Sequence, residues 1–594
     1  MTWEMVVVIV AIISMIVGLA LELARADMIV FGTVAMLLLL GILTPEEALN
    51  GFANEGMLTV ALLFIIVGAI QKSGVVEGAI RKILGSGQSE KKALLKILLP
   101  VPVLSAFLNN TPIVVALTPL IRKWCLERGL SPSKFLIPLS YITVLGGTMT
   151  LIGTSTNIVI HGLMLEKGMD GFSMFELGIV GLPLTMVGIL YLLTIGYKIL
   201  PSHKVTTTEK FKEQTRDYMC EFIVQSNYPF INQSVEEAGL RHLEGLFLIA
   251  IIRGKTKLSP VKSTTKIKME DRLIFAGLLS TIAELQQRKG LTLETGTELT
   301  LDTLKNGNSK LVEVVISDQS SLVFNKIRDT QFRGRYDAAV IAVHRNSERV
   351  KSKIGDIVLK PGDTLLLLTG SDFFEREHYN DFYVVTPIEI PKHIEDNIRG
   401  SIIALSTMLI MIILVTFNVL TMFKAMLLST IILLGLRIVT PEEAKQSIQF
   451  NVLLLIASSF GIGAALLKTG TATWIADGLV SITAPFGLVF VLLLIYLLTN
   501  IFTEIMSNTA TAVMMFPIAV EMANQLHINP MALIIIVTIS ASTAFATPIG
   551  YQTNLIVYGP GGYHFKDYLK VGIPLNILCM IVTVVIVYLV WIYN

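Results

Sequence analysis

Long apolar runs, separated by short polar stretches, occupy both ends of this 594-residue chain. A membrane-spanning helix needs about 20 mostly apolar residues, and the pattern predicts about ten such crossings. The first group covers residues 5–24, 28–43, 57–73, 135–165 and 176–198, and the second covers 400–418, 423–438, 451–467, 531–557 and 571–592. We therefore expect an α-helical integral membrane protein.

Two further apolar stretches, 97–121 and 488–520, are each interrupted by polar residues. The first contains Asn109-Asn110-Thr111-Pro112, and the second contains Ser507-Asn508-Thr509. Polar groups at membrane depth are costly unless they line a site or a cavity. Each stretch is therefore predicted to be a re-entrant helical hairpin with a polar tip.

The two apolar halves are copies of one pattern. Thr44-Pro45-Glu46-Glu47-Ala48 reappears as Thr440-Pro441-Glu442-Glu443-Ala444, and the ungapped match has 12 identities in 31 positions. The repeated block is typical of a helix start, with Thr as N-cap, Pro at the first position and Glu closing a capping box. The alignment continues, with small shifts, through both Asn-Thr stretches.

Charge predicts that the second copy is inverted. Five crossings per half is an odd number, so the two copies should enter the membrane from opposite sides. Residues 74–96 and 122–134 carry nine Lys and Arg, whereas 471–494 and 520–532 carry none. By the positive-inside rule the first pair of loops faces the cytoplasm. An inverted-topology repeat places its site near the midplane between the halves, so we expect the two tips to meet.

Residues 200–398 break the apolar pattern and are predicted to be soluble and cytoplasmic. They contain a repeat at an offset of 92: Glu221-Phe222-Ile223-Val224 matches Glu313-Val314-Val315-Ile316, and Asp271 matches Asp363. Short β-branched runs and predicted helices near 234–241 and 278–288 indicate α+β modules. The predicted order of domains is 1–200, first transmembrane repeat; 203–290 and 300–395, two modules; and 399–594, second repeat.

Composition agrees with a membrane protein. The chain is 53% hydrophobic and 15% charged, against roughly 25% charged in soluble domains. A net charge of +2 without a basic block gives no indication of nucleic-acid binding. The sequence has no nucleophile with a neighbouring base, no P-loop and no His-rich cluster, so we do not expect an enzyme.

The residues that could carry function are hydroxyls and amides at the hairpin tips and in the interrupted crossings. Such oxygens suit Na⁺, and broken helices whose N-termini point at the midplane suit an anion. No Lys or Arg lies in the tips or near the Thr-Asn of the interrupted crossings. Interhelical hydrogen bonding, worth ~0.6 kcal/mol per contact, is the alternative. Two matched clusters favour a binding site, and Glu504 is expected to pair with backbone donors.

The chain resembles the divalent anion/sodium symporter family of the ion transporter superfamily. The two tips and the segments Leu151-Ile152-Gly153-Thr154-Ser155-Thr156-Asn157 and Ala546–Asn554 resemble its sulfate-permease-like branch. The modules resemble TrkA-C (RCK C-terminal) domains through Pro361-Gly362-Asp363-Thr364-Leu365, and Met269–Leu273 fits with Glu in place of Gly.

The resemblance implies sodium-coupled symport of a small divalent anion by an elevator-type mechanism, in a homodimer embedded in the lipid of the plasma or inner membrane. It also implies two Na⁺ sites, a regulatory nucleotide at the modules, and specific ligands. The implied sodium ligands are Ser105, Asn110, Gly153, Thr503, Asn508 and Gly550. The implied substrate ligands are Asn109, Asn110, Thr111, Thr154, Ser507, Asn508, Thr509 and Tyr551.

Departures from the family pattern favour a small tetrahedral anion, such as sulfate, over a dicarboxylate. The first tip reads Asn-Asn-Thr where the family pattern is Ser-Asn-Thr. The interrupted crossings have Thr-Ser-Thr and Tyr-Gln-Thr where dicarboxylate carriers show Thr-Pro-Pro. Carriers of dicarboxylates, thiosulfate or taurine remain alternatives, as does a nutrient sensor that does not transport. A potassium channel would need a filter like Thr-Val-Gly-Tyr-Gly, which neither half contains.

Overall fold

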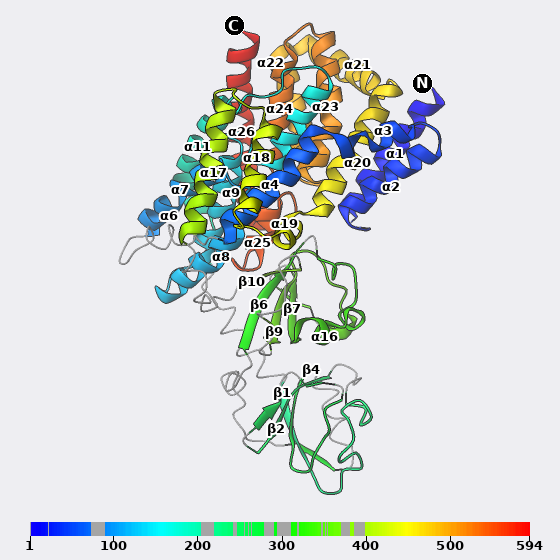
Figure 1. Ribbon diagram of the computed structural model, residues 1–594, viewed down its shortest axis with the longest axis vertical. Helices are drawn as coiled ribbons and strands as arrows, with labels where there is room; N and C mark the ends of the chain where they lie inside the picture. Colours follow the sequence, from blue (N-terminus) through cyan, green and yellow to red (C-terminus); the bar gives the residue numbers. More distant parts are fainter. Residues whose placement is uncertain are drawn as a thin grey trace.

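A computed structural model describes residues 2–21, 23–72, 90–202 and 398–593, together with most of 219–293 and of 310–384. Residues 241–245 and 278–289 are among those it leaves out of these middle ranges. Figure 1 shows a bundle of helices from both ends of the chain and, beside it, two small sheets from the middle. The sheet containing β6 and β9 lies between the bundle and the sheet containing β1 and β4.

The helices of the first half follow the predicted apolar runs. They are α1 (Trp3–Ala20), α2 (Ala26–Leu39), α3 (Pro45–Leu49), α4 (Glu55–Lys72), α6 (Glu90–Leu98), α7 (Pro100–Ser105), α8 (Asn110–Glu127), α9 (Leu136–Gly147), α10 (Ser155–Glu166), α11 (Gly178–Tyr191) and α12 (Tyr197–Ile199). The predicted crossing 135–165 is thus two helices, α9 and α10, with a non-helical segment between them. The predicted hairpin 97–121 contains α7 and most of α8, which are separated at the Asn-rich tip and of which α8 continues to Glu127.

The second half repeats this order. Its helices are α17 (Ile398–Thr416), α18 (Met422–Gly435), α19 (Pro441–Ser447), α20 (Phe450–Lys468), α21 (Thr471–Thr483), α22 (Leu488–Thr503), α23 (Asn508–Gln525), α24 (Pro530–Ser542), α25 (Gln552–Tyr558) and α26 (Phe565–Val587). Here α22 and α23 flank the second tip, and α24 and α25 are the broken crossing. The inversion of this half across a membrane stays a prediction.

Four of the described helical segments are long and apolar enough to cross a membrane: Pro45–Ile70, Gly178–Ile199, Phe450–Lys468 and Phe565–Ile592. The other apolar helices are shorter, and two of them end where the sequence predicts an interruption: Leu488–Thr503 at the second tip and Pro530–Ser542 at the break before α25. The predicted helix starts are confirmed, since Thr44 and Thr440 each form a complete capping box. One continuous apolar core joins the helices of both halves.

The two modules have the same topology. Module 1 contains β1 (Met219–Val224), β2 (Leu246–Arg253), β3 (Thr256–Leu258), β4 (Arg272–Gly277) and β5 (Leu291–Leu293), in the sheet order β3-β2-β4-β1-β5. Module 2 contains β6 (Lys310–Ile316), β7 (Ala338–Arg345), β8 (Glu348–Arg349), β9 (Thr364–Thr369) and β10 (Phe382–Val384), in the order β10-β6-β9-β7-β8. The two orders are the same when the second is read from its other end, because β8, β7, β9, β6 and β10 then stand where module 1 has β3, β2, β4, β1 and β5.

The repeat extends to individual contacts. Arg253 donates from Nε to Asp271 at 2.7 Å, and Arg345 donates from Nε to Asp363 at the same distance. The β2–β4 and β7–β9 pairings also have a register irregularity at equivalent places, between Leu248 and Ala250 in module 1 and between Val340 and Ala342 in module 2. The helix expected near 234–241 is wrong, because a bridge at Ser234 and successive turns occupy most of that stretch. The helix expected at 278–288 lies outside the described residues.

Candidate functional site

A cavity of about 280 Å³ is lined by both hairpin tips and by both broken helices. Among the polar residues in its wall are Asn109, Thr111, Thr154, Ser155, Thr156, Ser507, Asn508, Thr509, Tyr551 and Gln552. Residues more than 400 positions apart therefore face one space. Hydroxyl and amide groups of this kind can donate hydrogen bonds to an anion.

The first tip is held to the broken helix of its own half. The oxygen of the buried Ser105 hydroxyl lies 2.6 Å from the backbone oxygen of Thr143 and 2.5 Å from Oδ1 of Asn110, so its single proton is shared between two acceptors. The amide of Asn157 donates to the backbone oxygens of Gly147 and Thr150, at 3.2 and 2.8 Å. The two bonds from Asn157 satisfy carbonyl groups that the break in the helix leaves without intrahelical partners.

The second tip has the same arrangement. The oxygen of the Thr503 hydroxyl lies 2.7 Å from the backbone oxygen of Ala541, its nearer acceptor, and 3.0 Å from Oδ1 of Asn508. Asn554 donates to the backbone oxygens of Ala544 and Thr547, at 2.9 and 3.1 Å. Each half thus brings a hydroxyl, an amide oxygen and a backbone carbonyl together behind its tip.

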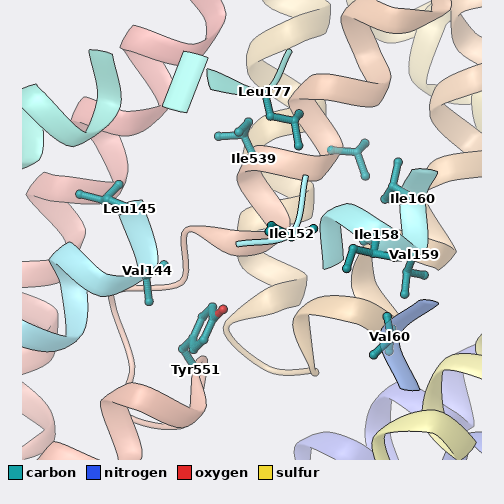
Figure 2. Packing of buried hydrophobic residues seen from close by; sticks show 14 of the residues in the cluster. Val60, Val144, Leu145, Ile152, Ile158, Val159, Ile160, Leu177, Ile539 and Tyr551 are labelled. Atoms are coloured by element: carbon teal, nitrogen blue, oxygen red, sulfur yellow. The ribbon is translucent and has the colours of Figure 1, made fainter. Parts of the chain in front are cut away.

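Tyr551 joins the two halves. Its hydroxyl accepts from Nδ2 of Asn110 at 2.5 Å and lies 3.2 Å from the Thr154 hydroxyl. A second bond between the halves runs from Thr111 to Gln552 at 2.9 Å. Figure 2 shows Tyr551 close to Val144 of the first half, in the cluster of buried apolar residues that also contains Ile539 of the second half. The polar contacts are therefore enclosed by an apolar core.

The predicted ligands divide into two layers. The expected substrate ligands line the cavity, with the exception of Asn110, which contacts Tyr551 from behind the wall. Four of the expected sodium ligands, Ser105, Asn110, Gly153 and Thr503, do not line the cavity, whereas Asn508 and Gly550 do. Gly153 is tightly packed, since a Cβ there would lie 2.8 Å from Cα of Gly147.

Sequence reasoning missed a charged pair in the wall. Arg25 and Asp27 are the charged residues among the described lining, and they form a two-pronged contact of 3.2 and 2.9 Å. The expectation that no fixed cation lies near the tips therefore needs correction, although the pair has no net charge. The available signal was the Arg-Ala-Asp sequence between two apolar runs, far from either tip in sequence.

Glu504 has the partners that the sequence predicted. Its carboxylate accepts from the backbone N–H groups of Ala546 and Thr547, at 2.7 and 2.9 Å. The Thr547 hydroxyl and the Asn576 amide also donate to it, at 2.8 and 3.0 Å. Because these bonds hold the non-helical segment between α24 and α25, Glu504 fixes the shape of the second half of the cavity.

We expect Tyr551→Phe to lower the thermal stability of the purified protein. Without the hydroxyl, the buried Nδ2 of Asn110 loses its acceptor, and an unsatisfied buried donor costs about 1–3 kcal/mol. The thermal midpoint in detergent measures this effect. Tyr593→Phe, at an exposed position, is the control. Equal midpoints for the two variants would contradict the importance of this contact between the halves.

A largely helical chain with polar tips from both halves facing one cavity has the arrangement expected of a membrane transporter. Residues 8–538 match the citrate transporter family (CitMHS), and the chain belongs to that family. This confirms the predicted relationship to anion/sodium symporters. The TrkA-C resemblance of the modules stays a prediction.

Several relatives align with nearly the whole chain. A putative sulfur deprivation response regulator of Chlamydomonas reinhardtii is 34% identical and aligns with 94% of this chain and 97% of its own length. An uncharacterized transporter of Synechocystis is 32% identical and aligns with 98% of this chain and 96% of its own length. Sodium/sulfate cotransporter 1 of C. reinhardtii is 25% identical and aligns with 91% of this chain and 84% of its own length.

Proposed function

We propose that this protein is a secondary transporter that carries sulfate together with Na⁺ across the cell membrane. The observation that carries the proposal is the single cavity lined by Asn109 and Thr111 of one tip and by Ser507, Asn508 and Thr509 of the other. A sulfate ion is compact and accepts hydrogen bonds on all sides, which matches a wall of hydroxyl and amide donors. The sodium/sulfate cotransporter among the relatives supports this substrate.

Electrostatics supports coupling to a cation. Arg25 is already paired with Asp27, so the charged side chains of the described wall add no net charge to balance a dianion. Uncompensated charge inside a membrane is costly. Behind the tips, the oxygen groups at Ser105 and Thr503 offer places for Na⁺, whose charge would offset that of sulfate. Anion binding would then require Na⁺.

The orientation that we propose places the modules in the cytoplasm. Module 2 contacts α8 at Arg122, in one of the stretches rich in Lys and Arg, and the positive-inside rule assigns such stretches to the cytoplasmic side. Homodimerisation, an elevator-type movement and a nucleotide bound by the modules also belong to this proposal. Calorimetry of the full-length protein with adenine nucleotides and cyclic dinucleotides tests the last of these.

We expect labelled sulfate to accumulate in proteoliposomes only when Na⁺ is present outside. Choline replaces Na⁺ in the matched control, and an imposed pH gradient without Na⁺ tests proton coupling. Because the cation offsets the dianion, the initial uptake rate should fall at least about tenfold in choline, which corresponds to ~1.4 kcal/mol. Equal uptake in both media would rule out sodium coupling.

One relative favours a second function. The similar protein named a putative sulfur deprivation response regulator aligns with nearly the whole chain, so the same architecture could serve as a sulfate sensor. A sensor would bind sulfate without moving it. Saturable, Na⁺-dependent binding to the purified protein, combined with no accumulation in proteoliposomes, would favour the sensor over the transporter.

A further inference from the structure

Module 2 forms part of the wall of the anion cavity. Val323, Phe324 and Pro361 line the same space as the two hairpin tips. We call residues 322–325 and 358–362 the lid edge. Within it, Phe324 donates its N–H to the backbone oxygen of Leu359 at 2.8 Å, and Leu359 donates to Asn325 at 3.1 Å. These bonds hold the two parts of the lid edge together.

Close contacts attach this module to α25, a helix of the proposed site, and to Gly559 directly after it. Gly362, at a φ of +81°, approaches Leu555 so closely that a Cβ there would lie 3.0 Å from its Cγ. A Cβ at Gly559 would lie 3.5 Å from Cβ of Thr364. Leu555 belongs to α25, which also carries Gln552 and packs against α8 of the first hairpin. The module therefore rests on the helices that hold the two tips together.

A buried ion pair joins the module to the first hairpin. An Nη1 of Arg122 on α8 lies 2.8 Å from Oε2 of Glu313 on β6, and the two side chains are 4% and 9% exposed. Removing one partner from such a pair leaves a charge buried without its counterion, which strongly disfavours the docked arrangement. The pair thus links the position of the module to that of α8.

The internal repeat indicates that this contact is specific to module 2. In module 1 the equivalent acid, Glu221, pairs with Arg272 of the same sheet. Thr364 occupies the position of Arg272 in module 2, in the same strand register. Glu313 has no arginine at this position of its own module, and it pairs with the membrane domain instead. Thr364 itself faces Gly559.

We propose that module 2 is a lid over the cytoplasmic mouth of the anion cavity, held closed by the Arg122–Glu313 pair and by the contact of Thr364 with Gly559. The proposal rests on the proposed function for the identity of the anion, but not for the closure itself. When the module is docked, the lid edge obstructs passage between the cavity and the cytoplasm. Release of the module opens that path, so the docking contact sets the rate of transport.

Two variants test the lid in opposite directions. In a protein with Cys125, Cys220 and Cys579 replaced by Ala, the pair Thr364→Cys and Gly559→Cys places two Cβ atoms within the range that a disulfide spans. Oxidation should lock the lid and lower sulfate uptake at least tenfold, with recovery on reduction. Thr364→Arg gives module 2 the internal Glu–Arg pair that module 1 has. Because Glu313 would then be drawn away from Arg122, the lid should be released and uptake should rise at least twofold. Thr256→Arg, on the exposed edge strand of module 1, is the matched control.

A measurement that does not use sulfate tests the lid independently of the proposed transport function. Val452 lines the cavity and is only partly exposed when module 2 is docked, so the rate at which a maleimide labels Val452→Cys reports access to the cavity. The reporter cysteine is introduced into two backgrounds, Thr364→Cys with Gly559→Cys and Thr364→Arg. In the first background, after the disulfide has formed, the maleimide should react at least tenfold more slowly than in the second. Equal labelling rates, failure of the disulfide to form, or full uptake by the locked protein would overturn the lid. No uptake by any form, with the labelling difference intact, would overturn only the proposed function.

Discussion

Glu504→Ala is expected to destabilise the protein by at least about 3 kcal/mol. The carboxylate accepts from the backbone N–H groups of Ala546 and Thr547 and from the side chains of Thr547 and Asn576. Each buried donor left without an acceptor costs about 1–3 kcal/mol, and the segment between α24 and α25 has no helical hydrogen bonds to replace them. The thermal midpoint of the detergent-solubilised protein measures the loss.

Two further variants sharpen this test. Glu504→Gln keeps the size of the side chain but turns an NH₂ group toward backbone N–H donors, so it should also be destabilising, though less than Glu504→Ala. Glu442→Ala removes an exposed acid that is not the capping-box glutamate of α19, and its midpoint should stay near that of the unmodified protein. A Glu504→Ala midpoint as high as that of Glu442→Ala would mean that the broken segment does not depend on this carboxylate.

Asn508→Ala is expected to reduce sulfate uptake by roughly 10- to 100-fold. Asn508 lines the cavity at the second tip, and a hydrogen bond to a charged ligand contributes about 1.5–3 kcal/mol. Folding should change little, because Thr503 keeps its bond to the backbone oxygen of Ala541 when Asn508 is lost. Initial rates in proteoliposomes, normalised to the amount of folded protein, measure the effect.

Asn524→Ala is the control for that variant. Asn524 is exposed near the other end of the same helix, α23, so the same chemical change is made away from the cavity. Its uptake should equal that of the unmodified protein. Uptake by Asn508→Ala at the control rate would place the anion elsewhere.

The apolar pattern predicted the helical elements closely, because length and hydropathy decide what can span a membrane. The breaks could also be predicted, since an uninterrupted apolar helix has no reason to contain Asn109, Asn110 or Asn508 at its centre. The repeat of the Thr-Pro-Glu-Glu block made the correspondence between the halves visible. The same correspondence appears in the matched bonds of Ser105 and Thr503.

Contacts between distant segments could not be predicted in this way. Arg25 and Asp27 reach the cavity wall only because α1 and α2 pack beside α20. The contact between Tyr551 and Asn110 spans 441 positions, and no local pattern encodes it. The stretch after Ser234 forms successive turns instead of the expected helix. Its spacing of polar and apolar residues is compatible with a helix and with a series of turns, so the pattern did not distinguish the two. The pairing of Glu313 with Arg122 joins residues far apart in the sequence. Only the register of the sheet shows that Thr364 occupies the position that Arg272 has in module 1.

Equilibrium binding of labelled sulfate to the purified protein, measured in NaCl and in KCl, tests the central claim most directly. If the two tips form one pocket that an anion occupies only with sodium beside it, sulfate should bind saturably in NaCl, with binding in KCl and binding to Asn508→Ala both at background. Equal affinity in the two salts, or unchanged binding by the variant, would contradict the account.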